Sequence, residues 1–194
     1  MKIGVLALQG DFPEHLAMLH GIDHGEPIEA VEVRLPDQLE TVDGLIIPGG
    51  ESTTIGKLMV AYGLQEPLRR RIAAGMPVFG TCAGAILLAR DIGGYDQPLI
   101  GVMDIAIRRN AFGRQLQSFE TDLPIAVLGG LPFRAVFIRA PAIESVGTAA
   151  EVLARLQNGT VVMARQRNML VAAFHPELTG DDRLHRWFLR MVAT

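Results

Sequence analysis

The most informative segment of the sequence is Pro77-Val78-Phe79-Gly80-Thr81-Cys82-Ala83-Gly84. It runs from a short apolar segment, typical of a buried strand, into a helix-like segment over Ala83–Arg90. The turn between them has the spacing G-x-C-x-G, which is typical of a sharp strand-to-helix turn because glycines leave space beside the central side chain. The pattern therefore predicts that Cys82 projects at the edge of a sheet, at the N-terminus of a helix, where the helix dipole favours a thiolate.

Apolar runs and helix-like segments alternate on the N-terminal side of this turn. The predicted strands are Ile3–Leu8, Ala30–Val33, Gly44–Ile47 and Pro77–Gly80, and the predicted helices are Phe12–His20, Thr54–Tyr62 and Pro67–Ala74. Strands that alternate with helices indicate crossover connections and a parallel sheet that is covered on both faces.

The C-terminal half has a different pattern, with strand-like segments from Leu99 to Phe174. The dipeptide Asn158-Gly159 predicts a hairpin between Val152–Gln157 and Thr160–Ala164. A final amphipathic helix is predicted over Asp181–Val192. We therefore expect an α/β fold, a three-layer sandwich with a mostly parallel central sheet and antiparallel additions in the C-terminal half, formed by a single domain over residues 1–194.

Composition excludes several classes of protein. The 194 residues include 18 Lys+Arg, 21 Asp+Glu and one Cys, with a formal net charge of −3. One Cys cannot form an internal disulfide or a Cys-rich zinc site, which favours a cytoplasmic setting. Without clustered basic residues or an apolar run of about 18 residues, neither nucleic acid nor a membrane is expected as a partner.

A second motif, Ala173-Phe174-His175-Pro176-Glu177, follows another predicted strand, Met169–Phe174. A thiol nucleophile needs a base that takes its proton and returns it to the leaving group, and the base needs a group that fixes its tautomer. We expect His175 to be the general base and acid and Glu177 to orient it. A His-x-Glu pair alone is weak evidence, and its position at a strand end gives it weight.

The third motif is Ile47-Pro48-Gly49-Gly50-Glu51-Ser52-Thr53, at the end of the strand over Gly44–Ile47. Adjacent glycines let the backbone turn its N–H groups toward a bound oxygen, so this loop is a candidate second oxyanion donor. A phosphate-binding loop is the alternative, because Gly56-Lys57 follows. The number of residues between Gly50 and Gly56 does not match the motif of such a loop, and Leu58 stands where Ser or Thr would bind Mg²⁺.

Other polar residues give weaker signals. A metal site at His15, His20 and His24 is not expected, because Gly21 and Gly25 break any continuous helix and no Cys joins them. A substrate carboxylate would need a fixed cation, and Arg offers a bidentate fork. The candidates are Arg108, Arg109, Arg134 and Arg139, and composition does not distinguish among them.

Together, the cysteine and histidine motifs resemble the triad glutamine amidotransferases, which carry Cys, His and Glu in that chain order. More narrowly, the chain resembles the glutaminase subunits of pyridoxal 5′-phosphate synthases. The likeness runs from about Lys2 to Met191 and rests on segments beyond those two motifs. These are Leu6-Ala7-Leu8-Gln9-Gly10-Asp11, Pro48-Gly49-Gly50-Glu51-Ser52-Thr53-Thr54, Arg109-Asn110-Ala111-Phe112-Gly113-Arg114-Gln115 and Phe174-His175-Pro176-Glu177-Leu178-Thr179.

The resemblance implies hydrolysis of L-glutamine to glutamate and ammonia, which passes to a separate synthase subunit for pyridoxal 5′-phosphate (vitamin B6) biosynthesis. It implies the catalytic residues Cys82, His175 and Glu177, and no metal or organic cofactor in this half-reaction. The implied glutamine contacts are Gly50, Glu51, Ser52, Arg109, Ile138 and Arg139. The Gly49-Gly50 pair suggests a subunit that is poorly active until docking reorients this peptide.

Two other functions stay open at this point. One is a stand-alone cysteine hydrolase or chaperone-like protein of the same sandwich class. The other is a catalytically silent binding subunit that keeps the fold. The intact set of Cys82, His175 and Glu177 argues against the silent subunit, and the glutamine-specific segments argue against the stand-alone hydrolase.

Overall fold

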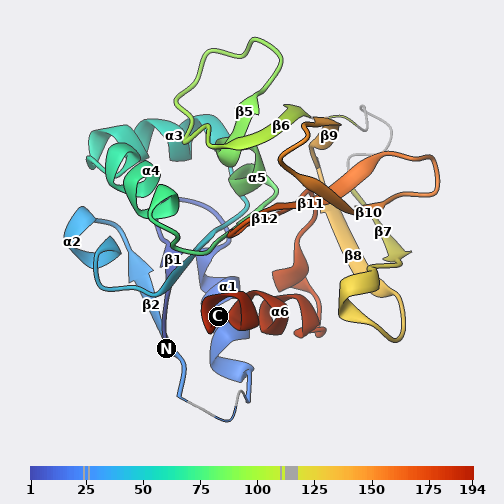
Figure 1. Cartoon of the computed structure of the whole chain (residues 1–194), viewed down its shortest axis with the longest axis horizontal. Coiled ribbons are helices and arrows are strands. Elements are labelled where there is room, and N and C mark those ends of the chain that lie inside the picture. The colour runs from blue at the N-terminus through green and yellow to red at the C-terminus, as the bar shows by residue number, and fades with distance from the viewer. Residues whose placement is uncertain (24, 26, 110, 112–117) are drawn as a thin grey trace.

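The structure is a computed structural model that describes residues 1–23, 25, 27–109, 111 and 118–194. In this part of the chain, the centre is a ten-stranded sheet in the order β2-β1-β3-β4-β12-β11-β9-β6-β5, with β10 beside β11 (Figure 1). Its first five strands pair in parallel. They are β2 (Glu29–Val33), β1 (Lys2–Leu6), β3 (Gly44–Ile47), β4 (Val78–Thr81) and β12 (Met169–Ala172).

The rest of the sheet is mainly antiparallel, as predicted for the C-terminal half. The strands are β11 (Val161–Gln166), β10 (Glu151–Arg155), β9 (Ala142–Val146), β6 (Met103–Arg108) and β5 (Ala89–Asp91). Of these pairs only β5 and β6 run parallel. A separate two-stranded sheet joins β7 (Ser118–Leu123) to β8 (Phe133–Ile138).

Helices cover both faces of the sheet, and each face has its own hydrophobic core. On one face lie α2 (Pro36–Leu39), α3 (Ser52–Ala61), α4 (Gln65–Ala73) and α5 (Ala83–Leu88). On the other lie α1 (Phe12–Gly21), α6 (Arg183–Val192) and the strands β7 and β8. The prediction of a three-layer α/β sandwich is therefore confirmed. Among the described residues, no helix is long and apolar enough to cross a membrane.

Strand β4 shows why this part of the sheet needs two layers of cover. Its consecutive residues Val78 and Phe79 are both fully buried, Val78 in the core on the α3/α4 side and Phe79 in the core on the α6 side. Successive side chains of a strand point to opposite faces, so a strand that is apolar throughout must be covered twice. The ring of Phe188 from α6 lies 5.8 Å from that of Phe79, centroid to centroid.

Several element boundaries differ from the sequence prediction; for example, β1 ends at Leu6 rather than Leu8, and α4 begins at Gln65 rather than Pro67. Two other differences have a clear cause in backbone contacts. The helix predicted over Ala83–Arg90 ends at Leu88, because Ala89 pairs with Met103 of β6 and the chain continues as β5. The hairpin at Asn158-Gly159 is confirmed, but its loop is longer than a two-residue turn. The Leu156 amide donates to the Thr160 carbonyl over 2.9 Å, which encloses residues 157–159.

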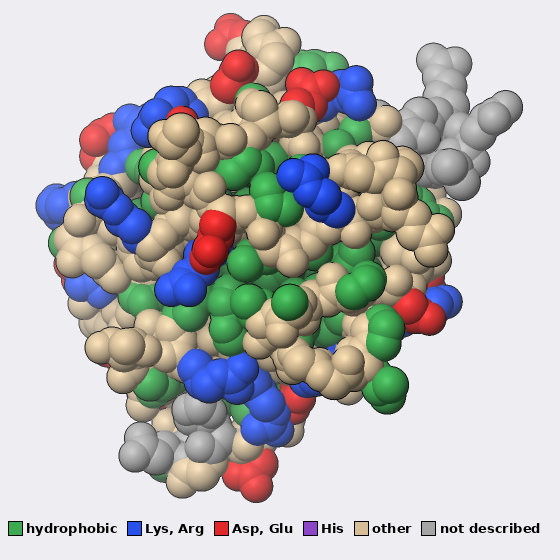
Figure 2. Space-filling model, turned by 45° about the vertical axis from the view of Figure 1, so that its right-hand side comes forward, with side chains coloured by type: hydrophobic (Ala, Val, Ile, Leu, Met, Phe, Trp, Pro, Cys, Tyr) green, Lys and Arg blue, Asp and Glu red, His purple; other side chains and the backbone are tan. Residues whose placement is uncertain are grey.

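The surface carries no single dominant charge on the face in Figure 2. Basic and acidic side chains both appear there, around an area of hydrophobic side chains. Over the described surface as a whole, many charged groups are paired, as in the ion pairs of Arg134 with Glu120 and Asp122 and of Arg108 with Glu144.

The contact of Phe188 with Phe79 predicts a stability effect. Replacing a fully buried Phe by Ala removes apolar contacts and leaves a cavity, so Phe188→Ala is expected to lower the free energy of unfolding by about 3–5 kcal/mol. Urea unfolding measures this change. Leu131→Ala is the control, since that side chain is 82% exposed and its loss should change stability by less than about 0.5 kcal/mol. Equal effects of the two substitutions would contradict the packing described here.

Candidate active site

The turn from β4 into α5 holds Cys82 in a backbone conformation that side chains rarely adopt. Its φ is 45° and its ψ is −101°, and its amide donates to the Ala172 carbonyl of β12 over 2.8 Å. The flanking glycines are required by contact. A Cβ at Gly80 would lie 2.7 Å from the carbonyl oxygen of Gly84, and a Cβ at Gly84 would collide with the Ile47 carbonyl oxygen. The predicted strand-to-helix turn is therefore present, with the thiol at its apex.

His175 follows β12, the neighbour of β4 in the sheet. Its Nδ1 lies 2.8 Å from Oε1 of Glu177 and 3.3 Å from Oδ2 of Asp11, and its backbone amide donates to the Val136 carbonyl of β8 over 2.8 Å. Both His175 and Glu177 are buried. With Nδ1 held by carboxylates, Nε2 is the ring nitrogen left for proton exchange with a substrate or nucleophile.

The electrostatics of this group favour a charged imidazole. Burial alone lowers the pKa of His175, but hydrogen bonds with Asp11, Cys82 and Glu177 outweigh it and raise the pKa to about 12. Burial raises the pKa of the Glu177 carboxyl, although its hydrogen bond with His175 opposes this. The site is therefore arranged to hold an imidazolium beside the thiol, which is the protonation state that can donate a proton to a leaving group.

The loop after β3 lies against the histidine and is anchored by the loop after β1. The Gly49 carbonyl accepts from the Asp11 amide over 3.1 Å, and the Glu51 amide donates to Oε1 of Gln9 over 2.7 Å. A Cβ at Gly49 would lie 2.9 Å from Nδ1 of His175, and Gly50 has a φ of 148°. Both positions thus require glycine, one for close approach and one for its backbone conformation.

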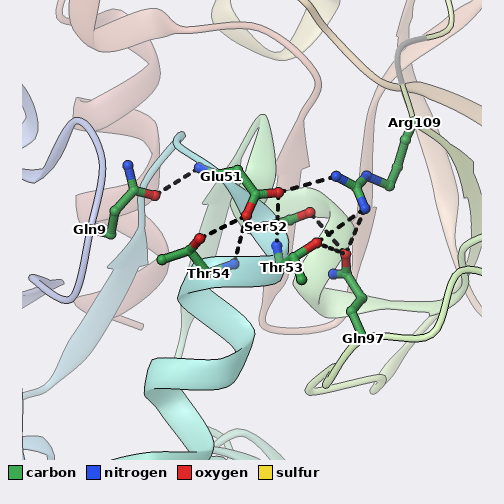
Figure 3. Close-up of polar contacts among 7 residues, drawn as sticks. All are labelled: Gln9, Glu51, Ser52, Thr53, Thr54, Gln97 and Arg109. Atoms are coloured by element: carbon green, nitrogen blue, oxygen red, sulfur yellow. Dashed lines mark hydrogen bonds and ion pairs between the residues drawn. The ribbon is translucent and has the colours of Figure 1, made fainter.

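Glu51 begins helix α3 and also faces an arginine (Figure 3). Its carboxylate accepts from the backbone amides of Thr53 and Thr54 over 3.2 and 2.7 Å. Burial alone would raise the pKa of the Glu51 carboxyl, but these bonds and the Thr54 hydroxyl outweigh it and lower the pKa below its ordinary value. Nη2 of Arg109 donates to Glu51 Oε1 over 3.2 Å, so an anion and a cation stand side by side at the cavity wall.

Arg109 is fixed by further contacts beyond Glu51 (Figure 3). Its Nη1 donates to Oε1 of Gln97 over 2.9 Å and to Oγ1 of Thr53 over 3.3 Å. The same Gln97 oxygen accepts from the Ser52 hydroxyl over 3.1 Å. The guanidinium also lies over the ring of Tyr95, 4.9 Å from its centroid. An arginine held at several points loses little conformational freedom when it binds a carboxylate.

A cavity of about 460 Å³ joins these groups. It is lined by Asp11, Gly50, Glu51, Ser52, Cys82, Ile86, Arg109, Ile138, Arg139, His175 and Leu178. Of the nine site residues predicted from the sequence, eight line this cavity, and Glu177 stands behind His175. Arg139 has a φ of 45°, a strained conformation of the kind that collects at ligand sites. The cavity therefore combines a thiol, an imidazolium, two carboxylates and two guanidinium groups.

Sequence reasoning did not single out three residues that shape this site: Asp11, Gln97 and Tyr95. Asp11 had a detectable signal, because it lies in a loop just after β1, at the carboxyl-end edge of the sheet where ligands bind in parallel sheets. Gln97 and Tyr95 gave none, since their role depends on contacts with segments distant in sequence.

Asp11, His175 and Glu177 also form a group whose ligand atoms lie within 4.8 Å of one another, close enough for a metal ion. The imidazole nitrogen in this group is already hydrogen-bonded to a carboxylate, and its raised pKa favours the protonated form, which cannot bind a metal. Among the other histidines, His15 is buried and His20 exposed, and His24 lies outside the described residues. Residues Asn110 and 112–115 of the quoted Arg109–Gln115 segment also lie outside them.

Comparison with known proteins agrees with this geometry. Residues 5–194 match the SNO glutamine amidotransferase family. The chain belongs to this family. A relative from Roseiflexus castenholzii, named pyridoxal 5′-phosphate synthase subunit PdxT, is 59% identical over 193 residues, which cover 98% of this chain and 100% of the relative. A relative of the same name from Pelotomaculum thermopropionicum is 60% identical over 189 residues, which cover 97% and 94%.

Solved structures include a similar glutamine amidotransferase and a more distant protein with the same fold. A crystal structure described as a glutamine amidotransferase has 52% sequence identity and a TM-score of 0.91, and the match covers 99% of each chain. A chain in the structure of PurLQS from Thermotoga maritima has a TM-score of 0.70 at 14% identity, covering 99% of this chain and 96% of that one. The second likeness shows that the fold is shared by more distant proteins.

Behind the cavity of this amidotransferase lie two further buried histidines. Nδ1 of His15, on α1, is 2.9 Å from Nε2 of His185, on α6. Nε2 of His15 is 3.1 Å from the Thr81 hydroxyl and 3.3 Å from Oε2 of Glu177. Burial lowers the pKa of both imidazoles, that of His185 to about 4, and the charges of His185 and His175 contribute to the lowering at His15.

The buried His185 predicts loss of stability in acid. Its folded-state pKa of about 4 lies below the ordinary value of about 6.5, so the unfolded chain binds the proton more readily. The stability that the neutral imidazole contributes is present above pH ~6.5 and is lost as the pH falls toward 4, by about 3 kcal/mol in all. The free energy of unfolding should be measured for the wild type and for His185→Gln across this pH range. As the pH falls, the wild type should lose about 3 kcal/mol more of it than His185→Gln does.

His20→Gln is the control for this measurement, because His20 is exposed on the same α1 helix that carries His15. It should follow the wild-type pH dependence. A wild-type stability that is no more acid-sensitive than that of His185→Gln would show that His185 is not held neutral.

Proposed function

We propose that this chain is the glutaminase subunit of a pyridoxal 5′-phosphate synthase, which hydrolyses L-glutamine and delivers ammonia to a separate synthase subunit. The observation that carries the proposal is the cavity in which the Cys82 thiol and the His175–Glu177 pair face Arg109 and Arg139. Relatives about 60% identical over nearly the whole chain bear the name of that synthase's PdxT subunit, which supports the same function.

Charges in the cavity suit the α-carboxylate and the α-ammonium group of glutamine. The guanidinium groups of Arg109 and Arg139 would bind the α-carboxylate, since guanidinium and carboxylate form paired charge-assisted hydrogen bonds. Glu51, whose pKa is lowered, would remain an anion and accept the α-ammonium group. Gly50, Ser52 and Ile138 would complete the contacts. This binding leaves the side-chain amide to extend toward Cys82.

Chemistry then proceeds through a covalent intermediate. The Cys82 thiolate attacks the side-chain amide carbon, and the backbone amides of Ala83 and Gly50 stabilise the oxyanion, with about 3 kcal/mol typical for one such donor. Ala83 is the first residue of α5, so its N–H has no acceptor within the helix. His175 gives a proton to the departing ammonia, then activates the water that hydrolyses the glutamyl thioester. Glu177 keeps the imidazole oriented throughout.

Docking of the synthase subunit is proposed to complete the oxyanion hole. Ammonia released into water becomes protonated and is lost as a nucleophile, so hydrolysis without a partner would waste glutamine. In this structure the Gly49 carbonyl is held by the Asp11 amide, and the Glu51 amide by Gln9. Reorienting the Gly49-Gly50 peptide toward the oxyanion would break the first of these bonds, and glycine at both positions makes that rotation possible.

Ammonia release from L-glutamine tests this function, with and without the cognate synthase subunit. We expect activity in the mixture, a rate at least about tenfold lower for the isolated chain, and none with Cys82→Ala. The Cys82→Ala protein should still bind glutamine, since the thiol is not among the binding groups. Equal activity with and without the synthase subunit would favour the stand-alone hydrolase, and inactivity in the mixture would favour the silent binding subunit.

A further inference from the structure

Three fully buried polar side chains lie behind the His175–Glu177 pair, and the proposed reaction does not use them. They are Thr81 of β4, His15 of α1 and His185 of α6, each with no exposed surface. Burial of a polar side chain is unfavourable unless hydrogen bonds replace those with water. The reason for three such groups at one place should therefore be found in their contacts.

The carboxylate of Glu177 is only half satisfied by His175. Its Oε1 lies 2.8 Å from His175 Nδ1, whereas its Oε2 is buried and has no hydrogen bond of normal geometry among the described residues. The nitrogen facing that oxygen is Nε2 of His15, at 3.3 Å. A buried carboxylate oxygen without a donor is costly, so the proton on this imidazole matters.

Protonation states follow from burial. Because burial lowers the pKa of His15 and His185, both imidazoles are neutral near pH 7 and each carries one N–H. Nδ1 of His15 and Nε2 of His185 lie 2.9 Å apart, so one of them donates and the other accepts. Only two arrangements of protons satisfy this contact.

The two arrangements differ in what they leave unpaired. If His15 donates from Nδ1, its bare Nε2 faces the Glu177 carboxylate, and a buried N–H on Nδ1 of His185 has no acceptor among the described residues. If His185 donates from Nε2, His15 carries its proton on Nε2, toward Thr81 and Glu177, and Nδ1 of His185 is a bare nitrogen. The second arrangement removes the lone-pair repulsion and the orphaned N–H.

We propose that His15 and His185 are positioning residues for the glutaminase reaction: His185 Nε2–H donates to His15 Nδ1, and His15 Nε2–H is shared between the Thr81 hydroxyl and Oε2 of Glu177. This relay fixes the carboxylate from the side opposite His175. Oε1 is then held toward His175 Nδ1, which leaves Nε2 of that ring for proton exchange with Cys82. The relay also connects α1 and α6, on one face of the sheet, to the catalytic group.

The inference rests on the proposed glutaminase function for its kinetic test, whereas its proton arrangement is measurable without any substrate. Nitrogen-15 NMR of the full-length protein, with labelled histidine, separates protonated from bare ring nitrogens. Spectra of His15→Gln, His185→Gln and His20→Gln assign the signals. Near pH 7, His15 and His185 should both be neutral with the proton on Nε2. A proton on Nδ1 of either ring, or an imidazolium at either position, would overturn the relay.

Kinetics of the chain in complex with its synthase subunit give the second test. His15 does not line the cavity, so His15→Leu should leave the KM for glutamine within about threefold and lower kcat on the order of 10–100-fold, as loss of an orienting partner does. His15→Gln keeps a donor near Glu177 and should recover part of kcat. The matched control is His20→Gln, on the exposed face of the same helix.

The outcomes separate this inference from the proposed function. A wild-type complex that releases no ammonia contradicts the glutaminase function, and the NMR result still decides the proton arrangement. A folded His15→Leu protein with wild-type kcat overturns the positioning role. A fall in kcat that His15→Gln does not recover, at equal thermal stability of the two variants, would also contradict it, because the donor to Glu177 would then be irrelevant.

Discussion

The hydrogen bond from the Cys82 amide to the Ala172 carbonyl ties the apex of a strained turn to the neighbouring strand. The order of the strands in the sheet determines which other loops lie near this turn. Strand β4 lies between β3 and β12, so the strand that leads to Gly49 and Gly50 and the strand that leads to His175 flank the strand that carries the thiol. Parallel strands direct their carboxyl ends to one edge of the sheet, where distant segments of the chain meet. A positive φ at Cys82 is retained because the surrounding layers hold it.

Electrostatic pairing is the second principle of the site. Two of the charged groups in the cavity are already held by neighbours: His175 by Glu177 and Asp11, and Arg109 by Glu51 and Gln97. Groups that are fixed before substrate arrives need little reorganisation during the reaction, and this is the main source of electrostatic stabilisation in enzymes. The two buried histidines extend the same arrangement behind Glu177, into the layer formed by α1 and α6.

The parallel half of the fold could be predicted from the sequence, because short apolar runs bounded by glycine or proline leave few alternatives to buried strands. The sequence also predicted catalytic roles for Cys82 and His175, since each stands in a short motif at a strand end. The arginines show the limit of residue reasoning. Four were candidates, and contacts distinguish them: Arg109 and Arg139 line the cavity, whereas Arg108 and Arg134 pair with surface carboxylates.

Features that depend on long-range contacts were beyond sequence reasoning. The end of α5 at Leu88 is set by pairing of the next residue with β6, and Gln97 matters only because Thr53 and Arg109 meet on its oxygen. The roles of the nine site residues came from motifs and family resemblance, and they remain predictions, as does the single-domain organisation. The fold class, by contrast, is confirmed by the sheet order and the two cores.

We propose that Cys82 is the nucleophile that takes the glutamyl group from glutamine. Acid quenching of the chain and its synthase subunit during turnover, followed by mass measurement of the intact chain and its peptides, tests this most directly. We expect one added glutamyl group, located on the peptide that contains Cys82 and absent from Cys82→Ala. Steady turnover of glutamine by the Cys82→Ala protein, or a glutamyl group on another residue, would contradict it.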